Sequence, residues 1–159
     1  QIDQATHAVV HFQKALKQDP QNIQLRARVA GALVAADQAK QGLTEYESII
    51  AEQPNAHQVR NTLAWLYATH PQVHRGPRAL ALVEPLARLT QHNDPRVLDT
   101  LAAAHACNRD FKRAISHAIE ARGLARATGE SALVKQLTER LANYHANEPW
   151  RSAAVKAPR

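Results

Sequence analysis

Apolar side chains recur along most of the chain at spacings of three and four residues, which is the period of one face of an α-helix. Prolines close two of these helical segments 34 residues apart, at Pro20 and Pro54. A small residue followed by an aromatic one precedes each proline at the same distance: Ala8 and Phe12, then Gly42 and Tyr46. A fixed period of this length indicates one helical unit used repeatedly.

The same period divides the whole chain into helical hairpins, of which the first lacks its first helix. We therefore predict an all-α fold of stacked antiparallel helix pairs. The expected segments are 1–22 (second helix of a truncated first repeat), 23–56, 57–94 and 95–128 (three repeats), 129–147 (a capping helix) and 148–159 (a flexible tail). Because the chain starts inside a hairpin and at Gln1, we interpret it as a piece of a longer protein.

The segment 57–94 departs from the regular unit. Twelve residues separate Tyr67 from Ala79, whereas nine separate the corresponding positions of the preceding unit, so three residues are inserted in the turn. Pro85 lies inside the following helix, expected over 78–90, and predicts a bend or a late start of that helix.

The last helical segment has one apolar and one polar side. The apolar stripe consists of Leu133, Leu137, Leu141 and Tyr144, and the polar side of Lys135, Gln136, Glu139 and Arg140. Such a helix suits the end of a repeat stack, where one face covers the last unit and the other meets solvent.

The repeated hairpin resembles the tetratricopeptide repeat, whose pattern is W-x2-L-G-x2-Y in the first helix and A-x3-F…P in the second. The first-helix matches are Arg26-x2-Val29-Ala30-x2-Leu33, Arg60-x2-Leu63-Ala64-x2-Tyr67 and Leu98-x2-Leu101-Ala102-x2-His105. The second-helix matches are Ala8/Phe12/Pro20, Gly42/Tyr46/Pro54, Ala79/Val83 and Ala114/Ala118. The leading Trp is absent, and the last two units lack the closing Pro. The resemblance implies a right-handed superhelical stack, and the stretches from Asn61 to Ala106 look like the C-terminal end of long bacterial repeat proteins.

In this family the first helices of successive units line a concave groove, which implies a surface for a partner peptide or helix. The positions carried over to this chain are Gln24, Ala27, Gly31, Val34 and Ala35; Gln58, Asn61, Trp65, Ala68 and Thr69; and Arg96, Asp99, Ala103, Ala106 and Cys107. Most are small, so the resemblance implies an open and mildly apolar channel. The residues predicted to contact a partner are Gln24, Ala27, Gly31, Gln58, Asn61, Trp65, Arg96 and Asp99.

Asn61 and Trp65 share one helix face, and this pair has two interpretations. In the first, the indole ring supplies contact area and the amide pairs with the backbone of an extended peptide. In the second, Trp65 packs against the 67–79 connection and Asn61 ties down a turn. We favour the second because large aromatic side chains are usually buried.

No catalytic or phosphate-binding motif accompanies the repeats. The pairs His7/His11 and His70/His74 lack the further ligands that a metal site needs, so we interpret the histidines as exposed. Cys107 is the single cysteine and is interpreted as a packing residue. We therefore predict no catalytic residue, no metal site and no cofactor.

The composition narrows the partners only a little. A net charge of +6 permits contact with nucleic acid, but the Lys and Arg residues are scattered and no aromatic residues alternate with them. We therefore expect no nucleic-acid partner. The longest apolar runs are too short for a membrane span.

The pattern as a whole favours a non-catalytic scaffold that binds a protein or peptide partner in the groove, and not an enzyme. The alternative is an accessory segment that positions substrate, or assembles chains, in a larger bacterial enzyme. A homo-oligomer through the first helix is also expected, because the helix that would cover its apolar side is missing.

Overall fold

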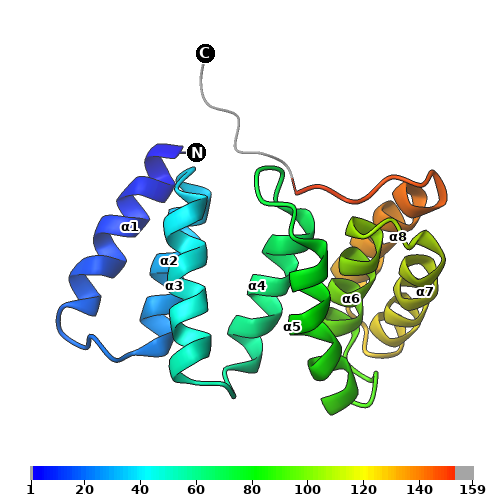
Figure 1. The fold of residues 1–159 in the computed structure, drawn as a ribbon, viewed down its shortest axis with the longest axis horizontal. Helices are drawn as coiled ribbons and strands as arrows, with labels where there is room; N and C mark the ends of the chain where they lie inside the picture. The colour runs from blue at the N-terminus through cyan, green and yellow to red at the C-terminus, as the bar shows by residue number, and fades with distance from the viewer. Residues whose placement is uncertain (1, 153–159) are drawn as a thin grey trace. The chain divides into compact units, whose positions relative to one another are not determined.

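The computed structural model describes residues 2–152, with side chains from residue 4, and every regular element in this range is a helix. The helices are α1 (Ile2–Leu16), α2 (Ile23–Ala35), α3 (Ala39–Glu52), α4 (His57–Thr69), α5 (Gly76–Leu89), α6 (Pro95–Cys107), α7 (Phe111–Ala127) and α8 (Ser131–His145) (Figure 1). The predicted all-α fold is confirmed.

The chain forms two compact units, and the boundary between them falls inside α4. Unit 1 ends at Arg60 and contains α1, α2 and α3. Unit 2 begins at Asn61 and contains most of α4 together with α5 to α8. The helices fall within the repeat segments expected from the sequence, but the repeat boundaries themselves stay a prediction.

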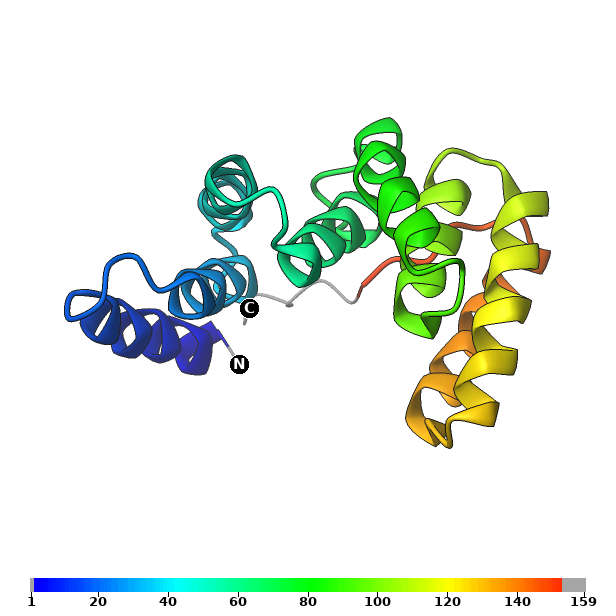
Figure 2. The ribbon, with the colours of Figure 1, turned by 90° about the horizontal axis from the view of Figure 1, so that it is seen from below.

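In unit 1, α2 packs against α1 on one side and α3 on the other (Figure 2). Val9 of α1 is buried with Val29 and Leu33 of α2, and Phe12 packs half-buried against them. The apolar side of α1 is therefore largely covered by α2 itself. Among the described side chains of α1, Val10 is a large apolar one that is exposed, with 63% of its surface accessible. The homo-oligomer expected through this helix stays a prediction.

A close helix contact and an ion-pair cluster join α2 to α3. A Cβ atom on Gly42 would lie 2.5 Å from the carbonyl oxygen of Ala30, so only glycine allows this approach. Arg26 occupies the position at which the repeat pattern has Trp. Its guanidinium lies 2.6 Å from a Glu45 carboxylate oxygen and 2.5 Å from one of Glu52, so ion pairs hold the helices where an aromatic ring would otherwise pack.

In unit 2, α6 is the central helix. It packs against both α5 and α7, and α8 packs against α7. Every α6 residue from Val97 to Ala106 is buried, and its alanines allow the neighbouring helices to approach closely. The Asp94 carboxylate caps α6 by accepting hydrogen bonds from the Arg96 and Val97 amides at 2.8 and 3.2 Å.

The turn between α4 and α5 spans residues 70–75 and is three residues longer than the turns at 36–38 and 108–110. The Arg75 amide donates to the Tyr67 carbonyl at 3.0 Å, and its guanidinium lies over the Tyr67 ring. The late start predicted for the next helix is wrong. α5 begins at Gly76, because Pro77 lies in the first turn, where no amide donor is needed, and the helix continues past Pro85 to Leu89.

Candidate functional site

Unit 1 presents three of the predicted partner-binding residues on one face of α2. Gln24, Ala27 and Gly31 are three and four residues apart and therefore share this face. Gln24 is exposed, and the two small residues are half-buried. Gln58, at the start of α4, is also exposed. The α2 face thus has one exposed and two half-buried residues, and a Cβ atom on Gly31 would lie 3.0 Å from the Tyr46 hydroxyl of α3.

In unit 2, other side chains lie against two of the predicted partner-binding residues, Trp65 and Asp99. Arg140 of α8 donates through Nη1 to Oδ2 of Asp99 on α6, and both side chains are about 8% exposed. The guanidinium carbon of Arg140 also lies 4.6 Å from the ring centroid of Trp65 on α4. The same carbon lies 5.6 Å from the ring centroid of Trp150. The expectation of an open channel is therefore wrong for this unit, because α8 and the segment after it cover the face.

The expectation that Arg140 lies on the polar side of its helix is also wrong. Leu137 and Tyr144 lie three and four residues away from it, so all three residues share one side of α8. The guanidinium can be buried there because the Asp99 carboxylate neutralises its charge and two indole rings lie against it. The stacking partner of Trp65 is thus Arg140, which neither interpretation of the sequence includes.

The Asp99–Arg140 pair is closely surrounded by protein. Burial raises the pKa of Asp99 to about 6, although the charge of Arg140 acts in the opposite direction. Oδ1 of Asp99 and Nε of Arg140 are buried and have no hydrogen-bond partner among the described residues. The nearby Tyr144 hydroxyl has none there either, and burial, followed by the charge of Asp99, raises its pKa. These buried polar atoms without hydrogen-bond partners therefore lower the free energy of unfolding of unit 2.

The segment after α8 returns to the C-terminal end of α4, as the orange-to-red part of the ribbon shows (Figure 1). The Ser152 amide donates to the Thr69 carbonyl at 3.1 Å, and Nη1 of Arg151 donates to the Ala68 carbonyl at 3.0 Å. The Thr69 and Ser152 hydroxyls are 2.9 Å apart. Residues 148–152 thus include specific contacts with α4, and the predicted flexibility of 148–159 stays a prediction. The rest of that tail, 153–159, lies outside the described residues.

The remaining predicted residues have different surroundings. Arg96 is exposed on α6 and pairs with Glu130, which precedes α8, at 2.5 Å. Asn61 is half-buried, and its Oδ1 has no hydrogen-bond partner within residues 4–152. The structure therefore groups Trp65 with Asp99 through Arg140 and leaves Arg96 at the edge of α8.

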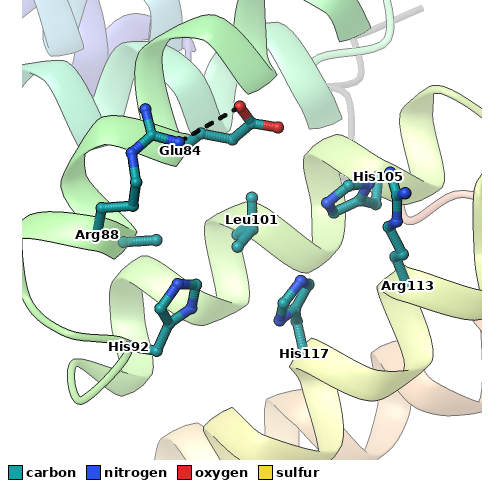
Figure 3. Close-up of a pocket in the computed structure, with 8 residues that line it drawn as sticks. Glu84, Arg88, His92, Leu101, His105, Arg113 and His117 are labelled. Atoms are coloured by element: carbon teal, nitrogen blue, oxygen red, sulfur yellow. Dashed lines mark ion pairs between the residues drawn. The ribbon is translucent and has the colours of Figure 1, made fainter.

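A second feature of unit 2 is a shallow pocket of about 280 Å³ between α5, α6 and α7 (Figure 3). Three imidazole rings line it, from His92 after α5, His105 on α6 and His117 on α7. The ring of His117 is stacked with both others, at centroid distances of 6.1 Å to His92 and 5.4 Å to His105. Glu84, Arg88 and Arg113 complete the polar part of the lining (Figure 3).

No sequence pattern predicts this pocket, because its histidines come from three separate segments and share no helical spacing. The prediction of exposed histidines is wrong for His105, which is 5% exposed. Burial, followed by the neighbouring His117, lowers the pKa of His105. No group of three or more His, Cys, Asp or Glu side chains placed to hold a metal ion occurs among the residues that the structure describes.

A model of the tetratricopeptide repeat family matches residues 3–66, which include α2, α3 and most of α1 and α4. No curated protein matches the chain. Within the described range, no helix combines the length and the hydropathy that crossing a membrane requires.

Proposed function

Residues 3–66 form tetratricopeptide repeats, and we propose that the chain is a non-catalytic scaffold that binds a partner protein through the exposed face of α2. Repeats of this family generally mediate protein–protein interaction, and the family is typically non-catalytic. The proposed contact residues are Gln24, Ala27 and Gly31.

The observation that carries this proposal is the accessibility of the α2 face within a matched repeat. Ala27 carries only a methyl group, so the backbone of a partner peptide can approach the helix closely at this position, while the Tyr46 hydroxyl of α3 lies against Gly31. The exposed Gln24 amide supplies both a donor and an acceptor for that backbone. A shallow apolar strip next to an amide suits an extended peptide or one side of a helix.

Selection of binding peptides from a random display library, with the intact chain as bait, tests this proposal. Peptides selected on the native chain should lose at least about tenfold in affinity for Ala27→Arg, equivalent to about 1.4 kcal/mol, because the long side chain fills the strip. Thr44→Arg is the matched control, since Thr44 is exposed on α3. Peptides that bind the native chain, Ala27→Arg and Thr44→Arg with equal affinity would show that the α2 face is not the peptide-binding site.

A further inference from the structure

The C-terminal end of α4 is completed by groups that come from elsewhere in the chain. A helix leaves its last four carbonyls without intrahelical donors. In α4 the Leu66 carbonyl accepts from the His70 amide at 2.9 Å, and the Tyr67 carbonyl accepts from the Arg75 amide at 3.0 Å. Both of these donors lie in the turn that follows. The other two carbonyls need donors from further away.

Those donors come from the segment Trp150–Ser152, 83 residues away in the sequence. As described above, the Arg151 guanidinium satisfies Ala68 and the Ser152 amide satisfies Thr69. The Thr69 hydroxyl already donates to the Trp65 carbonyl at 2.9 Å, so the Ser152 hydroxyl must donate to Thr69. Trp150 meanwhile lies on Arg140. Three consecutive residues thus supply an aromatic ring and three hydrogen-bond donors to one end of α4.

We propose that the end of α4, with Trp65 and Arg140, is a second peptide-binding site, which the chain's own segment Trp150–Ser152 occupies until a partner peptide of the same chemistry replaces it. The proposal extends the protein-binding role proposed above to unit 2, but it does not depend on the α2 face. The partner segment is extended, with an aromatic residue followed by Arg and by Ser or Thr.

The contacts define this chemistry. The Ala68 and Thr69 carbonyls are acceptors only, so a ligand must bring donors, and an arginine with an adjacent backbone amide fits both. The guanidinium of Arg140 favours an aromatic face over an aliphatic side chain. An acidic segment would bring acceptors to a site that already presents acceptors.

The segment can leave without unfolding unit 2. Trp150, Arg151 and Ser152 are all partly accessible, whereas Leu137, Leu141 and Tyr144 of α8 are buried. Asp99 and Trp65 continue to hold Arg140 when Trp150 departs. A short tether gives the segment an effective concentration on the order of millimolar, so a competing peptide binds more weakly to the closed chain than to an opened one.

Peptide binding to an opened variant tests the proposal. The triple variant Trp150→Ala, Arg151→Ala and Ser152→Pro removes the ring, the guanidinium and the amide donor. A labelled peptide with the sequence of residues 146–152 should bind this variant at least about tenfold more tightly than it binds the native chain. Glu148→Ala is the control, because Glu148 is exposed in the same segment, and it should bind like the native chain.

Three results of these binding experiments would contradict the proposed site at the end of α4. Equal affinity for the native chain and the triple variant, or no binding to a folded triple variant at millimolar peptide, would overturn the proposal. A peptide in which alanines replace the residues equivalent to Trp150 and Arg151 should bind at least about tenfold more weakly to the triple variant, and undiminished binding would refute the proposed chemistry. Because these experiments leave Gln24, Ala27 and Gly31 intact, failure here does not affect the α2 proposal.

Amide hydrogen exchange on the native chain provides a test that needs no variant. The Ser152 amide should exchange faster than the Leu141 amide, because the segment opens locally while α8 remains packed. Equal protection would mean that the segment leaves only when unit 2 unfolds, and the site would then be a permanent helix cap.

Discussion

The two units each bury an arginine between helices, but they do so in different ways. Arg26 in unit 1 bonds to Glu45, Ser48 and Glu52 on the adjacent helix, and about half of the Glu52 side chain is exposed. Arg140 in unit 2 pairs with one buried carboxylate between two indole rings. The Arg26 ion pairs join α2 to α3 and do not cover the face of α2 that carries Gln24 and Ala27. The Arg140 side chain instead covers the face of α6 that carries Asp99.

This difference shows that the position of a residue within a repeat does not decide whether its side chain is accessible. Ala27 is half-buried on α2, whereas Asp99, at the corresponding position on α6, is buried below α8. What decides is the element that follows. A helix with one long cation on its packed side, such as α8, can cover the face of the helix pair before it.

The largest expected effect is the loss of the buried carboxylate. Asp99→Ala leaves the Arg140 charge buried without its counterion, and unit 2 should lose about 3–5 kcal/mol in free energy of unfolding. Urea denaturation measures this loss. Replacing both partners, as Asp99→Leu with Arg140→Met, should recover most of it. A double variant as unstable as Asp99→Ala would show that the loss came from packing and not from an unpaired charge.

Gly42→Ala should have the next largest effect, in unit 1. The added methyl group would meet the Ala30 carbonyl and the Val34 side chain, both under 3.0 Å away, so we expect a loss of about 1–3 kcal/mol. Gly123→Ala is the matched control in a helix of unit 2, because no atom lies within 4 Å of its added Cβ. It should be stabilising by about 0.5–1 kcal/mol. Similar effects of both substitutions would contradict the close contact between α2 and α3.

Arg26→Gln should destabilise less than Asp99→Ala, and its effect should depend on salt. The partner Glu52 is well exposed, so dissolved ions screen this pair more than they screen the buried pair of unit 2. Thermal unfolding at low and high ionic strength should show the difference between the native chain and the variant shrinking as salt rises. A difference that is independent of salt would assign the contribution of Arg26 to packing alone.

The smallest effect concerns the pH dependence of unit 2. Because its pKa in the folded chain lies below the ordinary value of 6.5, His105 binds a proton more readily after unfolding. Its contribution to stability is therefore complete above pH 6.5 and is lost as the pH falls through the lowered pKa. His105→Gln should flatten the fall in unfolding free energy on acidification, as followed by urea denaturation at several pH values. Parallel profiles for the two proteins would exclude His105 as the cause.

Asp99 acts in the opposite sense over part of this range. Its folded pKa of about 6 is above the ordinary value of 3.8. The stability gained from proton binding at Asp99 is therefore complete below pH 3.8 and is lost as the pH rises through about 6, where the Arg140 pair remains. Comparing the unfolding free energy of His105→Gln, and of Asp99→Ala, with that of the native chain at the same pH separates the contributions of these two residues.

Local sequence patterns are sufficient to predict the helices. The three-four spacing identifies each of the eight helices in residues 2–152, and the small residue at Gly42 reflects a close crossing that the structure contains. The prediction that Leu137 and Tyr144 face the packed side of α8 is confirmed as well. These features depend on residues within a few turns of one another, which a period can reveal.

The candidate site in unit 2 could not be obtained in the same way. A local pattern places Arg140 on the polar side because charged side chains usually meet solvent, and only Asp99, 41 residues earlier in the chain, makes its burial favourable. The contacts of Arg151 and Ser152 with α4 span an even longer separation. Nothing in the residues around Trp150 indicates that two carbonyls at the end of another helix require donors.

The placement of both tryptophans on one guanidinium has a practical consequence. Trp65 and Trp150 are the chain's two indole groups, and both lie against Arg140. The tryptophan emission of the protein, which can be excited separately from that of its three tyrosines, therefore originates at a single place. A ligand that displaces Trp150 should change this emission without any added dye, whereas one that binds to α2 alone should leave it nearly constant.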